Sequence, residues 1–244
     1  MFSPYYAPLI LIPNSGMDRE TLTARESMLS RAVSRDTVIS VDCIPSGPTG
    51  ICSDTDEALA SLDVIRGCIQ AEKDGFDAVV IYCFSDLALG AVRENVRIPV
   101  IGPGEITMET AHRLSTLFTV ITTRSSNIPR IRRRMYRMET GKHVSSVRAL
   151  DITVEDLRED PNATKNRLKE VISQAIESEQ IDGVVLGCLG MAEYGDEISR
   201  EYGVNVYDPA MLSVAYAELC ARNHLIPSPK AYPLYQRGKE YGLL

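Results

Sequence analysis

Several residue types and motifs are missing from this chain. Its 244 residues include no Trp, only four Phe and only three His, and its six cysteines contain no CxxC pair. The absence of CxxC disfavours a zinc ribbon or a thioredoxin-type site, and the scattered His112, His143 and His224 do not form a histidine-rich metal centre. No GxxxxGK[ST] phosphate loop is present, and the GxGxxG match that starts at Gly102 breaks at Thr107. We therefore expect no metal and no other cofactor.

Long apolar runs and an excess of basic residues are also missing. No run approaches the length of a membrane span, and the opening MFSPYYAPLILIPNSG has no basic segment before its short apolar stretch. We expect a cytoplasmic protein without a signal peptide, whose cysteines are reduced thiols. A formal net charge of -7 and a pI near 5.1 disfavour nucleic acid and anionic membranes as partners.

One segment departs from this acidic character. Five arginines follow Pro129 in an expected helix: Arg130, Arg132, Arg133, Arg134 and Arg137. A phosphate or nucleic-acid patch is one interpretation of this cluster. A solvated helix face that pairs with acidic neighbours is the simpler one in an acidic protein. An oligomer contact is another use for such a face. We expect a small-molecule substrate, no nucleic acid, no membrane and a homo-oligomer.

Short apolar runs alternate with segments of helical spacing along the whole chain. This alternation is typical of α/β proteins with parallel sheets covered by helices, and continuous apolarity indicates strands buried on both faces. The expected strands are 8–12, 38–44, 78–83, 98–102, 118–123, 147–152, 183–188 and 204–208.

The chain contains an internal repeat. The segment GFDAVVIYC, which ends at Cys83, lines up with QIDGVVLGC, which ends at Cys188, 105 residues later (83 to 188). The following strands IPVIGP and VNVYDP also correspond, as do the opening strands PLILIPNS and FTVITTRS. Four matching strands in the same order predict two similar four-stranded, flavodoxin-like units related by a pseudo-twofold axis. We expect residues 1–103 with 209–244 in the first unit and 104–208 in the second.

The repeated cysteines carry the clearest chemical signal. Open α/β sheets bind ligands beyond the carboxyl ends of their strands, so we expect an active site in the cleft between the units, with Cys83 and Cys188 facing each other. We expect a helix from about Asp86, and amides at a helix start favour the thiolate form. One thiolate could then remove a proton next to a carbonyl while the opposite thiol returns one. A small buried apolar residue is the alternative interpretation of each cysteine.

The remaining cysteines lack this duplicated setting. Cys43 lies in an expected strand, and Cys68 and Cys220 lie in helical patterns, so core packing is the better interpretation of all three. Cys52 lies in a glycine-rich loop, where its role is open.

The chain resembles the aspartate/glutamate/hydantoin racemase superfamily, and within it the hydantoin and allantoin racemases. The motifs that carry the resemblance span most of the chain: IPNSG, SGPTGICSDTDEA, YCFSD, IPVIGPGE, FTVITT and LGCLGM. The resemblance implies a racemase in which Cys83 and Cys188 are catalytic. It also implies substrate contacts from residues at the strand ends, in part through backbone amides: Asn14, Ser15, Phe84, Ser85, Thr122, Thr123, Leu189 and Gly190.

Three departures bear on the substrate. Amino-acid racemases of the superfamily typically have Asn-Thr after the first cysteine and Thr after the second, whereas this chain has Phe84-Ser85 and Leu189-Gly190. This disfavours free aspartate or glutamate and favours a 5-substituted hydantoin or allantoin. Leu87 also stands where many hydantoin-type members have Pro. A racemase or isomerase acting on a small carboxylate and a non-catalytic small-molecule binding protein remain the alternatives.

Overall fold

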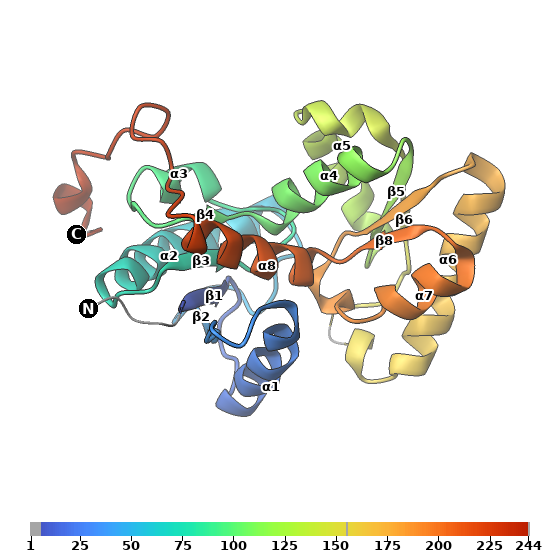
Figure 1. Ribbon diagram of the computed structural model, residues 1–244, viewed down its shortest axis with the longest axis horizontal. Coiled ribbons are helices and arrows are strands. Elements are labelled where there is room, and N and C mark those ends of the chain that lie inside the picture. The colour runs from blue at the N-terminus through green and yellow to red at the C-terminus, as the bar shows by residue number, and fades with distance from the viewer. Residues whose placement is uncertain (1–5, 155, 244) are drawn as a thin grey trace. The chain divides into compact units, whose positions relative to one another are not determined.

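The computed structural model describes residues 6–154 and 156–243. The chain divides into two compact units, one comprising Met1–Pro103 with Met211–Leu244 and the other Gly104–Ala210. Each unit is a four-stranded parallel sheet flanked by helices (Figure 1). No helix in the described part of the chain is long and apolar enough to cross a bilayer.

The sheet of the first unit has the order β2-β1-β3-β4, formed by Ser40–Cys43, Pro8–Ile12, Ala78–Ile81 and Val100–Ile101. All three pairings are parallel. The helices of this part of the chain are α1 (Arg19–Leu29), α2 (Asp54–Lys73), α3 (Leu89–Arg93) and α8 (Pro209–Arg222).

The second unit repeats this order as β6-β5-β7-β8, formed by Val144–Ala149, Phe118–Thr122, Gly183–Leu186 and Asn205–Tyr207. These pairings are parallel too, so the predicted two four-stranded parallel sheets are confirmed. The helices here are α4 (Pro103–Leu114), α5 (Ile128–Met135), α6 (Pro161–Glu179) and α7 (Gly195–Tyr202). Short 3-10 turns complete the described chain: η1 (Ser30–Ala32), η2 (Ser125–Asn127), η3 (Glu139–His143), η4 (Asp156–Arg158), η5 (Leu189–Met191) and η6 (Gly238–Tyr241).

One expected strand is displaced along the sequence. The apolar run 147–152 predicts a strand that the structure places at Val144–Ala149. The reason is that β6 is an edge strand, so polar Ser145, Ser146 and Arg148 interrupt the apolar pattern. Arg148 is held by an ion pair of 2.5 Å with Glu179 of α6.

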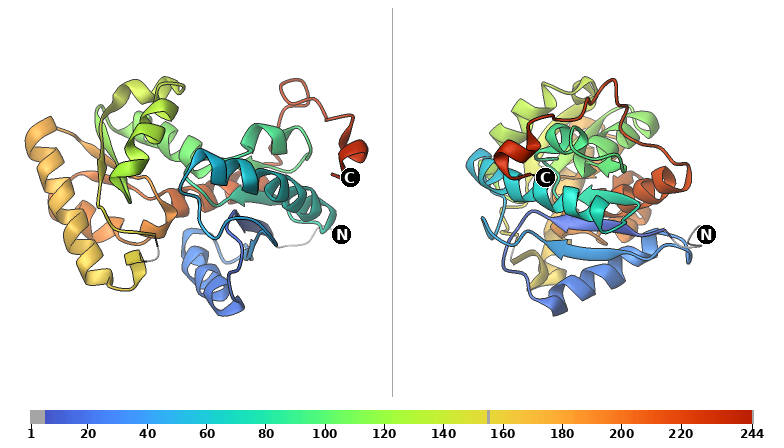
Figure 2. Two further views of the ribbon diagram at one scale, coloured as in Figure 1. Left: turned by 180° about the vertical axis from the view of Figure 1, so that it is seen from behind. Right: turned by 90° about the vertical axis from the view of Figure 1, so that its left-hand side faces the viewer.

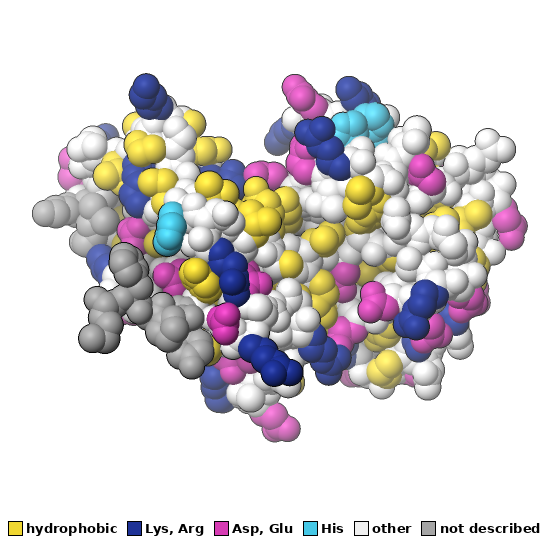
Figure 3. Space-filling view, in the orientation of Figure 1, with side chains coloured by type: hydrophobic (Ala, Val, Ile, Leu, Met, Phe, Trp, Pro, Cys, Tyr) yellow, Lys and Arg dark blue, Asp and Glu magenta, His cyan; other side chains and the backbone are white. Residues whose placement is uncertain are grey.

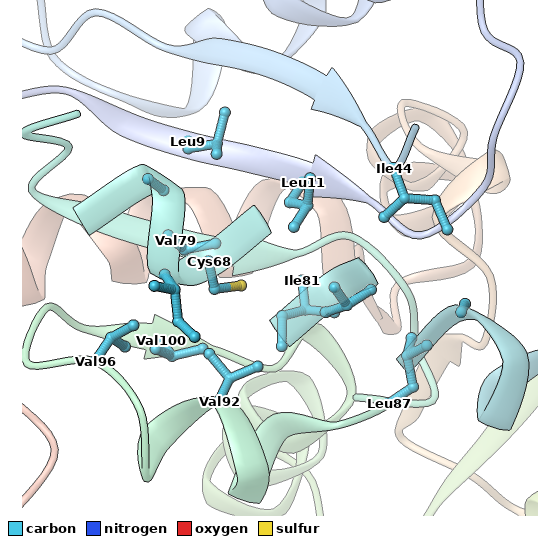
Figure 4. Close-up of a cluster of buried hydrophobic side chains, with 14 residues drawn as sticks. Leu9, Leu11, Ile44, Cys68, Val79, Ile81, Leu87, Val92, Val96 and Val100 are labelled. Atoms are coloured by element: carbon cyan, nitrogen blue, oxygen red, sulfur yellow. The ribbon is translucent and has the colours of Figure 1, made fainter. Parts of the chain in front are cut away.

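Alternate strand residues fill a core on the α2–α3 face of the first sheet. Leu9, Leu11, Val79 and Ile81 pack there against side chains of these two helices, among which Cys68 is completely buried (Figure 4). The second unit builds the same layer from β5, β7, α6 and α7. Both cores therefore hold the central strands from one side, which fixes where their carboxyl ends lie.

An aspartate before the third strand of each unit ties that strand to the first. Asp77 accepts a hydrogen bond of 2.8 Å from the Ala7 amide. Asp182 accepts two, of 2.8 Å from Thr116 and 3.0 Å from Leu117. Partial burial opposes ionisation of Asp182, but these amide donors outweigh it and lower the pKa of the carboxyl. The Asp shared by GFDAVV and QIDGVV thus has a structural role in each unit.

The last helix and the segment after it are bound to the first unit. Glu218 of α8 accepts hydrogen bonds from the hydroxyl groups of Ser34 and Thr37, at 2.5 and 2.7 Å. Beyond α8 the chain runs toward α3, where the Tyr235 amide donates to the Glu94 carbonyl at 2.9 Å (Figure 2). These contacts join the C-terminal part of the chain to the sheet that carries Cys83.

Candidate functional site

The candidate site is built at the carboxyl edges of the two central strands in each sheet. In the first unit β1 and β3 are neighbours, and the connection from β1 to β2 and the connection from β3 to β4 run toward opposite edges of the sheet. Such a switch point opens the crevice in which α/β sheets bind ligands. The register pairs Leu11 with Ile81, so Asn14 and Cys83 both follow the ends of these strands.

The second unit reproduces this arrangement. Here the register pairs Ile121 with Leu186, and Thr123 and Cys188 each lie two residues beyond that pair. Cys83 likewise lies two residues beyond Ile81. The two cysteines therefore occupy equivalent positions in their own sheets, and both are half-buried, neither sealed in a core nor fully exposed.

The loop after Cys83 differs from the expectation. No helix begins at Asp86, because Asp86 and Ala88 adopt left-handed backbone angles, with φ of 51° and 57°. The chain instead makes tight turns, with the Asp86 amide 3.1 Å from the Cys83 carbonyl, and α3 begins only at Leu89. The predicted helix start is therefore wrong at this cysteine. Strained angles in non-glycine residues persist where the surrounding structure holds them, often beside functional groups.

The sulfur of Cys83 lies 3.3 Å from the hydroxyl oxygen of Ser85. Either atom can be the donor in this contact, because a hydroxyl both donates and accepts. Ser85 is one of the residues that the sequence assigns to substrate binding. The structure brings its hydroxyl to the sulfur of its own loop.

Cys188 stands at the start of a 3-10 turn, η5. Its sulfur accepts a hydrogen bond from the Gly190 amide, with a nitrogen–sulfur distance of 3.4 Å. A side chain at position 190 would be crowded, since a Cβ there would lie 2.9 Å from Leu157 Cδ1 and 3.4 Å from the sulfur. A turn of backbone amides thus follows Cys188, as a 3-10 turn rather than the start of an α-helix.

In each unit an aspartate links the loop after the cysteine to the end of the fourth strand. The aspartate belongs to the loop in the first unit and follows the fourth strand in the second. In the first unit the Asp86 carboxyl packs against Gly102 after β4, where a Cβ would fall 2.6 Å from Asp86 Cγ. In the second unit Asp208 follows β8 and accepts a hydrogen bond of 2.9 Å from the Glu193 amide. Sequence reasoning missed Gly102 and Asp208 as loop supports, although both lie in the repeated segments IPVIGP and VNVYDP.

Two predicted contact residues follow β1. Asn14 is half-buried, and α1 is capped by Asp18, whose carboxyl accepts from the Thr21 amide at 2.7 Å. Asn14 therefore does not cap this helix. Ser15 donates its hydroxyl proton to the Gly47 carbonyl at 2.7 Å, and its amide bonds Pro48. Ser15 thus ties the end of β1 to the SGPTG loop.

The other predicted contacts are more enclosed. Thr122 and Thr123 are buried, and the Thr123 hydroxyl accepts a hydrogen bond of 3.2 Å from the Asn127 side chain. Phe84 and Leu189, the residues directly after the two cysteines, also have buried side chains. All four residues therefore have little solvent-accessible surface.

The remaining cysteines separate by burial. Cys68 and Cys220 are buried, and burial raises the pKa of both thiols. Cys43 is half-buried rather than part of a core, because it ends β2, and Cys52 is exposed. Core packing is therefore confirmed for Cys68 and Cys220 only.

The second unit has another surface feature. A hollow of about 530 Å³ in the second unit is lined by α5, η3 and the first part of β6, including Arg132, Tyr136 and Lys142. It contains none of the predicted site residues. Basic side chains lie over α5, with acidic side chains among them (Figure 3). This mixture is typical of a solvated helix face.

Two histidines that are far apart in the sequence are neighbours in space. The rings of His112 and His143 lie against each other with their centroids 4.2 Å apart and their planes tilted by 37°. Within residues 6–154 and 156–243, no three His, Cys, Asp or Glu residues are grouped closely enough to hold a metal ion.

Comparison with known proteins agrees with this architecture. The family model for Asp/Glu/Hydantoin racemase matches residues 9–217. A hydantoin racemase of Pseudomonas sp. (strain NS671) is 34% identical over 199 residues, which cover 79% of this chain and 78% of that protein.

Two solved structures extend the likeness. The allantoin racemase from Klebsiella pneumoniae has a TM-score of 0.87 at 24% identity, covering 95% of this chain and 94% of its own. The allantoin racemase from Pseudomonas fluorescens has a TM-score of 0.85 at 25% identity, covering 94% and 97%. With a family model that spans both sheets and both cysteine loops, the chain belongs to the Asp/Glu/hydantoin racemase family, and it is an isomerase of the racemase type.

Proposed function

We propose that this racemase works without a cofactor and uses Cys83 and Cys188 as its acid–base pair on a 5-substituted hydantoin or allantoin. The observation that carries the proposal is the equivalence of the two thiols. Each lies two residues beyond a paired position of the central strands, at the switch point of its own sheet. A duplicated thiol suits a reaction that needs the same chemistry on both faces of one carbon.

The proposed step is a pair of proton transfers. The thiolate of one cysteine takes the proton from the carbon next to the carbonyl, and the electron pair of the broken C–H bond moves onto the carbonyl oxygen as an enolate. The thiol of the other cysteine gives its proton to the opposite face of that carbon. No electron is gained or lost, and the enzyme ends with the thiol and the thiolate exchanged. The mechanism requires the carboxyl edges of the two sheets to meet around the substrate.

The negative charge on the enolate oxygen needs fixed donors. Backbone amides of the loops after Cys83 and Cys188 are proposed for this role, since preorganised amides stabilise an oxyanion strongly. We assign the buried positions Phe84 and Leu189 to such backbone contacts. The remaining proposed substrate contacts carry polar side chains or an accessible backbone: Asn14, Ser15, Ser85, Thr122, Thr123 and Gly190.

The substrate class rests on the named relatives and on the residues after each cysteine. Hydantoin and allantoin racemases share the family and much of the chain length. Both candidate substrates are five-membered cyclic ureides with an acidic carbon beside a carbonyl. Small carboxylates, such as aspartate, glutamate or maleate, are the alternative substrates.

A substrate panel in heavy water tests the proposal. Enantiopure 5-substituted hydantoins, allantoin, aspartate and glutamate would be incubated with enzyme and followed by proton NMR and polarimetry, and maleate, which is achiral, would be followed by proton NMR alone. We expect loss of optical rotation together with deuterium incorporation for a ureide, unchanged by EDTA. A Cys83→Ala/Cys188→Ala double variant measures the spontaneous rate. Activity only on a carboxylate, or activity lost with EDTA and restored by one metal, would contradict the proposal.

Two further proposals concern the setting of the enzyme. The mechanism needs both thiols reduced, which fits the cytoplasm. We also propose a homo-oligomer without nucleic-acid or membrane partners, which native mass spectrometry of the purified protein tests directly.

A further inference from the structure

The residue two positions after each catalytic cysteine differs between the units. Ser85 follows Cys83 at this distance and Gly190 follows Cys188, and each reaches the sulfur of its own cysteine. The contact lengths are similar, 3.3 Å from the Ser85 hydroxyl and 3.4 Å from the Gly190 amide. The same position thus holds the sulfur in both halves, through a side chain in one and through the backbone in the other.

The two donors are chemically different. A backbone amide only donates, and the 3-10 turn fixes its direction, so the Gly190 amide favours the thiolate of Cys188 at all times. A serine hydroxyl rotates, so it can donate to a thiolate or accept from a thiol. The hydroxyl of Ser85 can therefore follow Cys83 through both of its protonation states.

The Cys83 loop also carries a charged side chain, Asp86. The Asp86 carboxyl is directed against Gly102 after β4, as the 2.6 Å approach of a Cβ at that glycine shows. A carboxylate close to the sulfur would also oppose the thiolate rather than favour it.

We infer that Ser85 is the positioning residue of Cys83, whose hydroxyl stabilises the thiolate that forms when Cys83 gives up its proton, in the role that the Gly190 amide fills for Cys188. The inference rests on the proposed two-thiol function and refines the role of Ser85 from substrate contact to support of the first thiol. Ser85 acts through Cys83 and does not itself exchange a proton with the substrate.

Thiol alkylation in the absence of substrate tests this role. Iodoacetamide labels thiolates, so the labelling rate of each cysteine across a pH series reports its ionisation. Trypsin places Cys83 in peptide 74–93 and Cys188 in peptide 170–200, each without another cysteine, so mass spectrometry follows both in one sample. In Ser85→Ala we expect labelling of Cys83 at neutral pH to fall about tenfold, the effect of losing one hydrogen bond to a charged group.

Four variants make the result specific. Ser85→Thr keeps a hydroxyl and is expected to restore the labelling curve of Cys83. Ser85→Gly, which introduces the residue found at position 190 of the second unit, is expected to lower the labelling rate of Cys83 as Ser85→Ala does. It replaces Ser85→Ala in the test if that variant does not fold. Ser61→Ala removes a hydroxyl that bonds only the Glu57 carbonyl of α2 among the described contacts, and is expected to change neither curve. The Cys188 curve is expected to keep its position in Ser85→Ala.

The outcomes separate this inference from the proposed function. An unchanged Cys83 curve in Ser85→Ala and Ser85→Gly, with racemisation reduced, would overturn the inference and return Ser85 to substrate binding. A shifted Cys83 curve in a protein that racemises no member of the substrate panel would sustain the Ser85 contact and refute the function. Failure of Ser85→Thr to restore the labelling curve of Cys83 would also contradict the proposed role of the Ser85 hydroxyl.

Discussion

The two units are built on one plan but support their cysteines differently. Both sheets place a thiol two residues beyond the same paired position of their central strands. After Cys83 the chain makes tight left-handed turns and contacts the sulfur with a hydroxyl. After Cys188 it enters a 3-10 turn and contacts the sulfur with an amide. The two units thus share the strand framework and the thiol, and they differ in the loop that contacts each sulfur.

The largest expected effect tests whether both halves are needed. Cys83→Ala and Cys188→Ala are each expected to reduce racemisation at least about a thousandfold, because inversion needs an acid and a base on opposite faces. The remaining thiolate still exchanges protons on its own face, so each variant is expected to incorporate deuterium into one enantiomer only. We expect Cys83 to exchange the D form and Cys188 the L form, as the family resemblance implies. NMR in heavy water with each pure enantiomer measures this, and substantial racemisation by either variant would disprove the two-thiol mechanism.

The next effect tests whether the contact of Asp86 with Gly102 holds the loop after Cys83 in place. Gly102→Ala would bring a methyl group within 2.6 Å of Asp86 Cγ, which forces the loop after Cys83 to move. We expect racemisation to fall about tenfold to a hundredfold, because displacing a catalytic group by about 1 Å has an effect of this size. Gly90→Ala in α3 is the matched control, since a Cβ there meets no atom within 4 Å. Equal activity in the two variants would show that the Asp86–Gly102 contact does not support the site.

A smaller effect concerns the buried thiols, both of which lie in the first unit. The raised pKa of Cys68 means that its thiol ionises more readily in the unfolded chain than in the folded one. Its contribution to stability is complete below the ordinary thiol pKa of 9.0 and is lost as the pH rises above it. Against Cys68→Ala, the wild type is expected to lose about 1.4 kcal/mol of unfolding free energy per pH unit above that value. Urea unfolding at several pH values measures the difference.

The exposed Cys52 provides the control for that measurement. Cys52→Ala is expected to keep the pH dependence of the wild type. Loss of the dependence in Cys52→Ala but not in Cys68→Ala would contradict the assignment.

The smallest effect compares the two strand-linking aspartates. Asp182→Ala removes two amide hydrogen bonds and Asp77→Ala removes one, so the former is expected to be the more destabilising variant. Both side chains meet solvent, so each loss is expected to stay below about 1 kcal/mol. Because amide donors lower the pKa of Asp182, its contribution is present above the ordinary value of 3.8 and disappears as the pH falls below it. Thermal unfolding at neutral and acidic pH measures the loss of stability in each variant. A larger loss in Asp77→Ala than in Asp182→Ala would contradict the prediction.

Much of this protein follows from its sequence alone. The alternation of apolar runs with helical spacing determines two parallel sheets, because strands buried on both faces must be apolar throughout. The repeat of GFDAVVIYC and QIDGVVLGC determines that both thiols end equivalent strands, since side chains at matching positions of matching strands share one edge of their sheets. The candidate catalytic residues could therefore be named before any coordinates were known.

The tertiary structure decided what surrounds each thiol. Left-handed angles at Asp86 and Ala88 replace the expected helix start. Aspartate adopts such angles more often than most residues, but alanine does not, so the angle at Ala88 reflects packing of the loop rather than local preference. The loop after the cysteine is held by Asp86 in the first unit and by Asp208 in the second, and which aspartate does so depends on how the loop packs against the end of the fourth strand. The contact of the Ser85 hydroxyl with the Cys83 sulfur likewise depends on a rotamer and a turn. Sequence periodicity determines which residues share an edge, whereas the distances that tune a thiol arise only when the loops pack.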